Sequence, residues 1–176
     1  MQIINISKKI YERILLKSGL ERRIKYLRKQ GISIGQNCLI NTMSFSTEPY
    51  LIEIGNNVRI AGGTQFITHD GSIKCFKDEF EGDIFGKIKI GNNVFIGSSS
   101  IILLNTTIGD NCIIGAGSVV RGNFPDNSVI MGNPAKKVLN MNIQRMLVRY
   151  NKGYLKTKNL TSSQKERLIK THFNIE

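Results

Sequence analysis

The sequence has no tryptophan, few aromatic residues and no long apolar run. Of its 176 residues, 40% are hydrophobic but 7% are aromatic, so a core must be built mainly from aliphatic side chains. No stretch approaches the roughly 20 apolar residues that a membrane-spanning helix needs. The run Ile14-Leu15-Leu16 is too short for the core of a signal peptide. We therefore expect one cytoplasmic domain with modest additions.

Cysteine and histidine are also scarce. Three cysteines, an odd number, argue against a disulfide framework. Cys38 and Cys112 occupy equivalent places in the repeat described below, where free cysteine would serve as a small core residue. Cys75 lies outside the repeat with no base near it in sequence, so it is a weak candidate nucleophile. A catalytic zinc site needs three protein ligands. The two histidines, His69 and His172, do not suffice, and we predict no metal.

The net charge of +12 is concentrated at the two ends of the chain. Residues 1–30 carry +7 and residues 135–176 carry +8, whereas residues 31–134 carry −3. A basic protein can bind nucleic acid or anionic membranes. Here the aromatic residues do not interleave with Lys and Arg as stacking platforms would, so we expect no nucleic-acid partner. The ends are interpreted as solvated faces of capping segments. Peripheral association of the N-terminal segment with a membrane stays open.

A six-residue repeat dominates the middle of the chain. Each unit begins with a large apolar residue, its second position is Gly or Ala in seven units, and its fifth is Cys, Ser, Thr or Val in nine. The leading residues are Ile34, Ile40, Ile54, Ile60, Phe66, Ile90, Ile96, Ile102, Ile108, Ile114 and Val120. The fifth positions are Cys38, Ser44, Val58, Thr64, Val94, Ser100, Thr106, Cys112 and Ser118.

This period fits neither a helix nor a long strand. A helix would scatter every sixth residue around its surface, since it turns about 100° per residue. Glycine at every sixth position would weaken a long strand. A short strand followed by a corner explains the pattern, with the leading residue pointing inward and Gly or Asn allowing the bend. Three strands per turn would close a triangular prism whose coils stack their aliphatic residues, as solenoids do.

Two stretches resemble a known family. IGNNVFIGSSSIILLNTTIGDNCIIGAGSVV is similar to the signature of the hexapeptide-repeat acyltransferases, and NFPDNSVIMGNPAKKV is similar to their closing segment, which ends in G-x-P-A. The resemblance covers about residues 32–138. It implies an all-β solenoid, the left-handed parallel β-helix. The left hand rests on the resemblance alone, because the usual crossover between parallel strands is right-handed.

Three segments follow from this interpretation. Residues 1–31 form a helical segment, because apolar residues recur near helical spacing and Gly31 is a plausible stop. Residues 32–138 form the β-helix. Residues 139–176 form a helical cap or tail, with TSSQKERL giving a helix start near Ser162. The apolar N-terminal positions are Ile6, Ile10, Ile14, Leu20, Ile24 and Leu27.

Two breaks interrupt the repeat, one from Asn41 to Leu51 and one over residues 68–87. The second is rich in aromatic and acidic residues and is predicted to be a loop extruded from the prism, where functional sites concentrate. His69 lies at its root. An alcohol needs a base to act as a nucleophile at neutral pH, and imidazole, with a pKa near 6.5, suits that task.

The resemblance assigns roles to these residues. ITHDGSI is similar to a segment of capsule and lipopolysaccharide O-acetyltransferases, which implies that His69 is the general base. Asp70 would either orient the imidazole ring or begin a turn, and Asp-Gly favours the turn. Galactoside-type relatives bind the acceptor through an asparagine upstream of the histidine, which corresponds to Asn41.

The resemblance also implies acetyl-CoA as the donor and a homotrimer with each site in the cleft between neighbours. The pantetheine arm would lie along residues that match family positions, and cationic side chains would bind the phosphates. The first set is Phe95, Ser98, Ala116 and Gly117. The second is Arg121, Lys136 and Lys137.

The leading hypothesis is an acetyl-CoA-dependent O-acetyltransferase that acts on a sugar hydroxyl in surface polysaccharide biosynthesis. N-acetylation of an amino-sugar, or acetylation of serine or an antibiotic, uses the same scaffold. Serine acetyltransferases usually carry a longer helical front domain. γ-Carbonic anhydrases share the helix but need three histidines for zinc. A non-enzymatic module that binds membrane or nucleic acid is a distant alternative.

Overall fold

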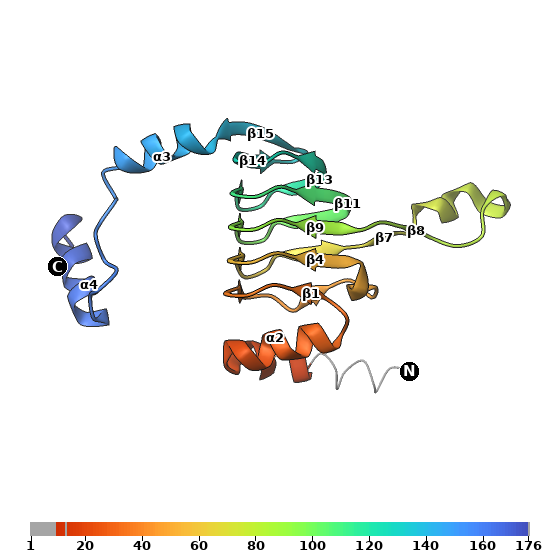
Figure 1. Ribbon diagram of the computed structural model, residues 1–176, viewed down its shortest axis with the longest axis horizontal. Coiled ribbons are helices and arrows are strands. Elements are labelled where there is room, and N and C mark those ends of the chain that lie inside the picture. Colours follow the sequence, from red (N-terminus) through yellow and green to blue (C-terminus); the bar gives the residue numbers. More distant parts are fainter. Residues whose placement is uncertain (1–9, 13, 176) are drawn as a thin grey trace. The chain divides into compact units, whose positions relative to one another are not determined.

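A computed structural model describes residues 10–12 and 14–175 of the chain. Met1–Met141 and Asn142–Glu176 form two separate compact units. The first unit is a stack of coils with short parallel strands, closed by a helix at one end and by a hairpin at the other (Figure 1). The left-handed parallel β-helix that the repeat and the resemblance predict is confirmed.

The coils have three faces. Face one contains β1 (Ser33–Ile34), β4 (Ile52–Ile54) and β9 (Ile88–Ile90). Face two contains β2 (Leu39–Ile40), β5 (Arg59–Ile60), β10 (Phe95–Ile96), β12 (Ile113–Ile114) and β14 (Ser128–Gly132). Face three contains β3 (Ser44–Phe45) and β6 (Gln65–Ile67). β11 (Ile101–Ile108) and β13 (Val119–Phe124) bend from face three into face one.

The core matches the predicted repeat. All eleven leading residues are buried, with exposed fractions of 7% or less. Cys38 and Cys112 are buried among them, as expected for core residues, whereas Cys75 is exposed. Because leading residues of successive coils pair in register, for example Ile54 with Ile90, their side chains stack in columns.

The corner between faces one and two, the Asn corner, explains why Asn and Gly alternate there. Asn57, Asn93 and Asn111 have φ between 55° and 56°, a left-handed conformation that Asn tolerates. Glycine serves a different purpose from the bending predicted for it. A Cβ on Gly55 would lie 2.7 Å from the carbonyl oxygen of Gly91, so these glycines allow the coils to stack closely.

The first coil departs from the predicted register. Ser44, at the fifth position of its unit, is exposed, whereas Cys38 and Cys112 at the same position are buried. Phe45 points inward instead and stacks on Phe66, with ring centroids 4.9 Å apart. The next inward leader, Ile54, follows nine residues later and not six. The additional residues form a corner that includes the 3-10 helix η1 (Pro49–Leu51) between faces three and one.

The N-terminal segment is helical in two pieces. Residues 10–12 and 14–17 are helical, and α2 (Leu20–Lys29) follows after Gly19. The expected apolar stripe is partly wrong: Leu27 is buried as predicted, but Ile10 and Ile14 are more than half exposed and Leu15 is buried in their place. Ile6 lies outside the described residues. Gly31, with φ 102°, ends the helical segment as predicted.

The last coil and the second unit complete the chain. β15 (Ala135–Asn140) pairs antiparallel with β14 and covers its edge. α3 (Met141–Arg149) and α4 (Ser162–His172) follow, and Thr161 and Gln164 form a capping box at the start of α4, as TSSQKERL predicts. None of the helices in the described part of the chain is long and apolar enough to cross a membrane.

Candidate active site

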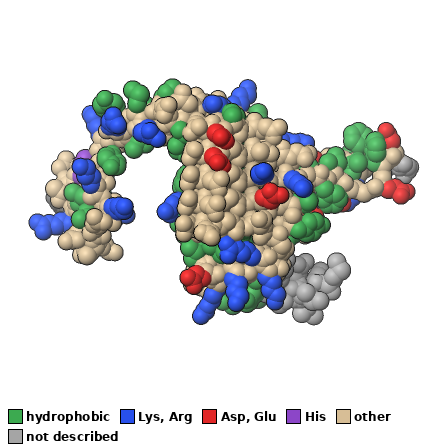
Figure 2. Space-filling model, in the orientation of Figure 1, with side chains coloured by type: hydrophobic (Ala, Val, Ile, Leu, Met, Phe, Trp, Pro, Cys, Tyr) green, Lys and Arg blue, Asp and Glu red, His purple; other side chains and the backbone are tan. Residues whose placement is uncertain are grey.

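The second break forms a projecting hairpin at the corner between faces three and one, which we call the loop corner. It contains β7 (His69–Asp70), the 3-10 helix η2 (Ser72–Glu79) and β8 (Ile84–Phe85). The backbone N–H of Gly86 donates to the carbonyl of Thr68 at 2.9 Å and closes the base of the hairpin. Hydrophobic side chains gather on it (Figure 2), including Phe76, Phe80, Ile84 and Phe85.

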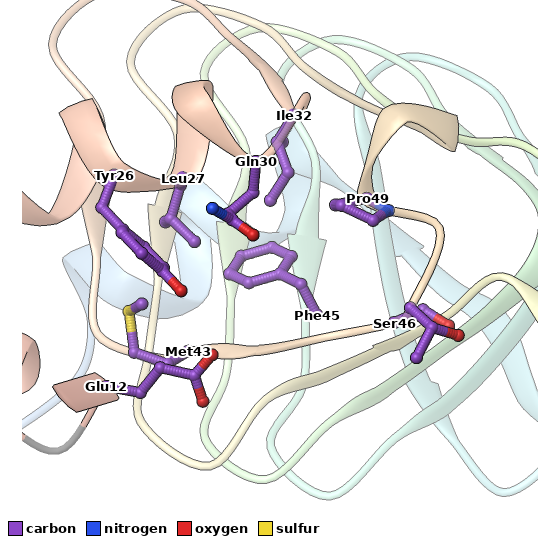
Figure 3. A pocket seen from close by; sticks show the side chains of 10 residues that line it. Glu12, Tyr26, Leu27, Gln30, Ile32, Met43, Phe45, Ser46 and Pro49 are labelled. Atoms are coloured by element: carbon purple, nitrogen blue, oxygen red, sulfur yellow. The ribbon is translucent and has the colours of Figure 1, made fainter. Parts of the chain in front are cut away.

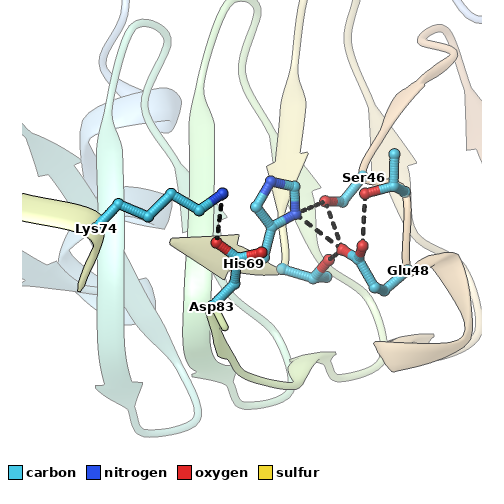
Figure 4. A network of polar contacts seen from close by, with 7 residues as sticks. Ser46, Glu48, His69, Lys74 and Asp83 are labelled. Atoms are coloured by element: carbon cyan, nitrogen blue, oxygen red, sulfur yellow. Dashed lines mark hydrogen bonds and ion pairs between the residues drawn. The ribbon is translucent and has the colours of Figure 1, made fainter. Parts of the chain in front are cut away.

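His69 contacts a carboxylate that comes from the coil below. Its Nδ1 lies 2.9 Å from Oε2 of Glu48 and 3.2 Å from Oγ of Ser46. Oγ1 of Thr68 donates to the same Glu48 oxygen at 2.8 Å, and Oγ1 of Thr47 donates to the other at 2.5 Å. Nε2 of His69 points away from this network, as Figure 4 shows. The histidine side chain is 40% exposed, so its far edge is open to a substrate.

The environment of Glu48 fixes its charge and thereby the tautomer of His69. Burial opposes ionisation of this carboxyl. Hydrogen bonds from Thr47, His69 and Thr68 outweigh burial and lower the pKa of Glu48 to about 2. An ionised carboxylate only accepts hydrogen bonds, so Nδ1 of the neutral ring carries the proton that Glu48 receives. The lone pair is then on Nε2, where a base that accepts a proton from substrate would need it.

Sequence reasoning missed Glu48. The repeat has two breaks, and the coil geometry places both at the loop corner. Glu48 precedes η1 in the first coil, and His69 follows β6 in the second. The signal was the first break in the repeat, which holds one acid, Glu48, between Asn41 and Leu51. The site therefore lies where the prism departs from its repeat on two successive coils.

Asp70 and Arg121 lie on the side of the prism that carries His69. Oδ1 of Asp70 accepts from the backbone N–H of Ser72 at 2.8 Å, so the carboxylate closes a turn at the start of η2. Hydrogen bonds from Ser72 lower the pKa of Asp70, and the positive charge of Arg121 adds to this effect. Arg121 follows Val120, which pairs with Ile102, and so occupies the loop corner of a higher coil.

The other predicted donor residues lie elsewhere on the same chain. Ser98, Ala116 and Gly117 occupy the corner between faces two and three, where Gly117 N–H donates to the Ser98 carbonyl at 2.9 Å. We call this the small-residue corner. Phe95 is exposed on face two. Lys136 and Lys137 are exposed on β15, beside β14. Within one chain, the expected cluster of Arg121 with the two lysines is therefore divided between the loop corner and face two.

Asn41 is also on the small-residue corner, directly after β2, and not beside His69. Its Oδ1 accepts from Nη1 of Arg23 at 3.3 Å. Arg23 is 7% exposed, and its Nε is buried without a hydrogen-bond partner among the residues that the structure describes. Within a single chain, face three separates Asn41 from His69. A role of Asn41 in binding the acceptor therefore requires a neighbouring chain.

A small cavity lies between α2 and the first coil, next to Ser46 (Figure 3). Tyr26, Leu27 and Phe45 line it, and its free volume is about 60 Å³. Pockets for small molecules usually have roughly 300–1,000 Å³, so this cavity is too small for a sugar ring. Burial raises the pKa of Tyr26 here, and the charge of Glu12 adds to this effect.

The described residues offer no cluster of metal ligands. Across residues 10–12 and 14–175, no group of three or more His, Cys, Asp and Glu side chains is placed to hold a metal ion. The site consists instead of an imidazole, an ionised carboxylate and three hydroxyl groups at the edge of a rigid coil. Such an arrangement suits general base catalysis.

The coil architecture and the histidine site define a class of enzyme, and comparisons agree with it. Residues 87–122 match the family described as bacterial transferase hexapeptide (six repeats). The chain is 41% identical to Protein CapG of Staphylococcus aureus, over 90% of this chain and 92% of that protein. It is 31% identical to the galactoside O-acetyltransferase of Escherichia coli K12, over 78% and 68%. The chain belongs to the hexapeptide-repeat acyltransferase family and is an acyltransferase.

Solved structures have the same fold. A maltose O-acetyltransferase from Clostridium difficile 630 is 27% identical and matches 77% of this chain and 87% of its own, with a TM-score of 0.58. A galactoside acetyltransferase in complex with coenzyme A is 23% identical and matches 89% of both chains, with a TM-score of 0.53.

Proposed function

We propose that the protein transfers the acetyl group of acetyl-CoA to a hydroxyl group of a sugar, with His69 as the general base. The observation that carries this proposal is the 2.9 Å contact between Nδ1 of His69 and Oε2 of Glu48 in an acyltransferase of this family. The contact leaves Nε2 as the basic atom at the open edge of the ring. General base catalysis of this kind contributes about 10²–10⁴ in rate.

The reaction would proceed in a single displacement. Nε2 of His69 removes the proton from the acceptor hydroxyl as its oxygen attacks the thioester carbonyl carbon. The imidazolium that forms is stabilised by the ionised carboxylate of Glu48, which stays ionised because its pKa is about 2. Collapse of the tetrahedral intermediate breaks the carbon–sulfur bond, and the proton on Nε2 goes to the departing thiolate. This route needs no acyl-enzyme, and the exposed Cys75 has no part in it.

The donor would bind in a groove between two chains of a homotrimer. Support comes from the related fold solved with coenzyme A and from the positions of the matching residues. Ser98, Ala116 and Gly117 lie on the small-residue corner, which is separated from His69 by face three. Two prisms packed side by side would bring the small-residue corner of one chain to the loop corner of the next. Arg121, Lys136 and Lys137 would then bind phosphates of the donor from two directions.

A sugar is the acceptor that the relatives favour. The names galactoside O-acetyltransferase and maltose O-acetyltransferase belong to proteins that this chain resembles. A place in surface polysaccharide biosynthesis follows from the resemblance of ITHDGSI described above. Asp70 and, from a neighbouring chain, Asn41 are the polar side chains that we assign to the acceptor. The enzyme would act in the cytoplasm, where acetyl-CoA is made.

Product analysis tests this function. The protein is incubated with acetyl-CoA and either methyl β-galactoside or glucosamine, and the products are analysed by mass spectrometry before and after mild alkali. We expect a mono-acetylated galactoside whose acetyl group is removed by alkali, as an ester is. An alkali-stable product from glucosamine alone would show that the enzyme is an N-acetyltransferase.

Membrane association of the N-terminal segment remains a separate prediction. Ile10, Tyr11 and Ile14 are each more than half exposed, next to a strongly basic stretch of chain. Co-sedimentation with anionic liposomes at low salt would support it, and its absence would rule it out.

A further inference from the structure

The hairpin places an aromatic ring directly beside the catalytic histidine. β7 and β8 pair antiparallel, with His69 opposite Phe85 and Asp70 opposite Ile84. Side chains of directly opposed residues stand on the same face of a two-stranded ribbon. The rings of His69 and Phe85 accordingly lie 6.3 Å apart between centroids, at an angle of 57°.

The side chain of Phe85 is largely exposed to solvent. Its side chain is 53% exposed, whereas Phe66 in the core of the same prism is 2% exposed. Exposed apolar residues that lie together mark binding sites, and Phe85 lies beside Ile84, which is 42% exposed on the same hairpin. Since one edge of His69 is occupied by Glu48, a molecule that reaches the other edge would pass across the neighbouring surface of the hairpin.

Several contacts within the hairpin position this ring. Nζ of Lys74 lies 3.3 Å from Oδ1 of Asp83, and this ion pair connects η2 to the residue that precedes β8. The Asp70–Ser72 turn and the Gly86–Thr68 hydrogen bond hold the other side. A surface fixed by its own contacts loses little conformational entropy when substrate binds, which favours accurate positioning.

We propose that Phe85 contacts the acceptor and determines its specificity, stacking against the apolar C–H face of a sugar ring so that one hydroxyl reaches Nε2 of His69. This inference rests on the proposed function and adds to it the part of the acceptor that is recognised. A pyranose presents hydroxyl groups around its rim and C–H groups on its faces. A flat aromatic side chain can hold the ring by a face while polar groups select the hydroxyl.

Phe85 should matter for the acetylation of sugars but not for that of simple alcohols. An open-chain alcohol such as glycerol has no ring face to stack, so its acetylation should not depend on Phe85. Phe85→Leu keeps apolar bulk but removes the flat surface. Phe80→Leu is a matched control, because Phe80 is a 46% exposed aromatic on the same hairpin whose ring contacts Phe76.

The experiment compares these variants of the full chain in steady-state acetyl transfer from acetyl-CoA to methyl β-galactoside and to glycerol. For Phe85→Leu, we expect the KM for the galactoside to rise about tenfold, with kcat changed less than twofold and kcat/KM for glycerol unchanged, because the lost stacking is worth about 1.4 kcal/mol. Phe80→Leu should match the wild type with both acceptors.

Other outcomes would overturn the proposal. An unchanged galactoside KM in Phe85→Leu, or an equal loss with both acceptors, would mean that Phe85 only supports the hairpin. A change of oligomeric mass in size-exclusion chromatography would mean that Phe85 packs against another chain. His69→Ala tests the proposed function separately. If this variant has no activity while Phe85→Leu behaves as the wild type, the proposed function stands and the inference about Phe85 is wrong. If the wild type acetylates no hydroxyl, both fail.

Discussion

At the scale of the residue, Glu48 decides what His69 can do. A histidine at the edge of a coil can rotate and can carry its proton on either nitrogen. The 2.9 Å contact with an ionised carboxylate holds the ring in one orientation and keeps the proton of the neutral ring on Nδ1. Ser46, Thr47 and Thr68 in turn hold that carboxylate. These contacts keep Glu48 ionised and hold His69 in the tautomer that carries its proton on Nδ1.

Replacing Glu48 by Gln tests this arrangement. The amide removes the negative charge that stabilises the imidazolium, so we expect kcat to fall by about 10–100-fold, a share of the effect of the base itself. Ser46→Ala is the control, since it keeps the charge and should cost less than tenfold. A Glu48→Gln enzyme with the kcat of the wild type would contradict the account.

Glu48 also links the site to stability at low pH. Its folded-state pKa of about 2 lies below the ordinary value of 4.5, so folding favours the charged form. The resulting stabilisation is fully present above pH 4.5 and is lost as the pH falls through about 2. We expect wild type to unfold at higher urea concentration than Glu48→Gln at pH 6, with the difference shrinking towards pH 2.5. A difference that grows on acidification would show that the carboxyl is neutral in the folded protein.

At the scale of the element, each coil repeats a short strand followed by a corner. The glycines that allow neighbouring coils to stack closely should not tolerate a larger residue. A Cβ on Gly91 would lie 2.7 Å from the backbone carbon of Gly109 and 2.8 Å from its oxygen. Those atoms belong to the next coil and cannot move without disturbing the ladder. The spacing of coils thus depends on the absence of a methyl group at a few positions.

We predict that Gly91→Ala lowers the free energy of unfolding by about 2 kcal/mol, as overpacked cores do. Gly62→Ala is the matched control within the same prism, because its Cβ would meet nothing closer than 3.7 Å, the carbonyl oxygen of Asn41. Urea unfolding followed by circular dichroism measures both. Equal stabilities of the two variants would mean that close stacking of the coils is not what these glycines provide.

The same scale shows how far the sequence predicts the structure. Every leading residue of the repeat was predicted to be inward and is buried, because a period of six leaves a prism few alternatives. The register of the first coil could not be predicted, since Phe45 and Ser44 compete for one inward place and the choice depends on stacking against Phe66. Glu48 could not be assigned for a related reason. Its distance to His69 depends on two irregular corners that stack only once the coils are formed.

At the scale of the whole molecule, the prism separates the residues that we assign to the acceptor from those that we assign to the donor. His69 and Glu48 lie on the loop corner, and Ser98, Ala116 and Gly117 lie on the small-residue corner at the other edge of face three. A monomer does not bring these groups together. If the site is shared between chains, each chain contributes a base to one site and a donor surface to another.

Mixed oligomers test this sharing. His69→Ala removes the base, and Ala116→Trp places a bulky ring on the donor surface, so each homo-oligomer should be inactive. Co-expressed chains should recover about a quarter of wild-type activity, because that share of sites in a cyclic assembly would combine one intact base with one intact donor surface. No recovery in mixed oligomers of confirmed composition would mean that each chain holds a complete site of its own.

The measurement that tests the central claim most directly is turnover of His69→Ala with a galactoside acceptor, together with its affinity for coenzyme A by calorimetry. We predict that kcat falls by about 10²–10⁴ while coenzyme A binds as tightly as it does to the wild type. Turnover near that of the wild type would show that the imidazole at the root of the hairpin is not the base.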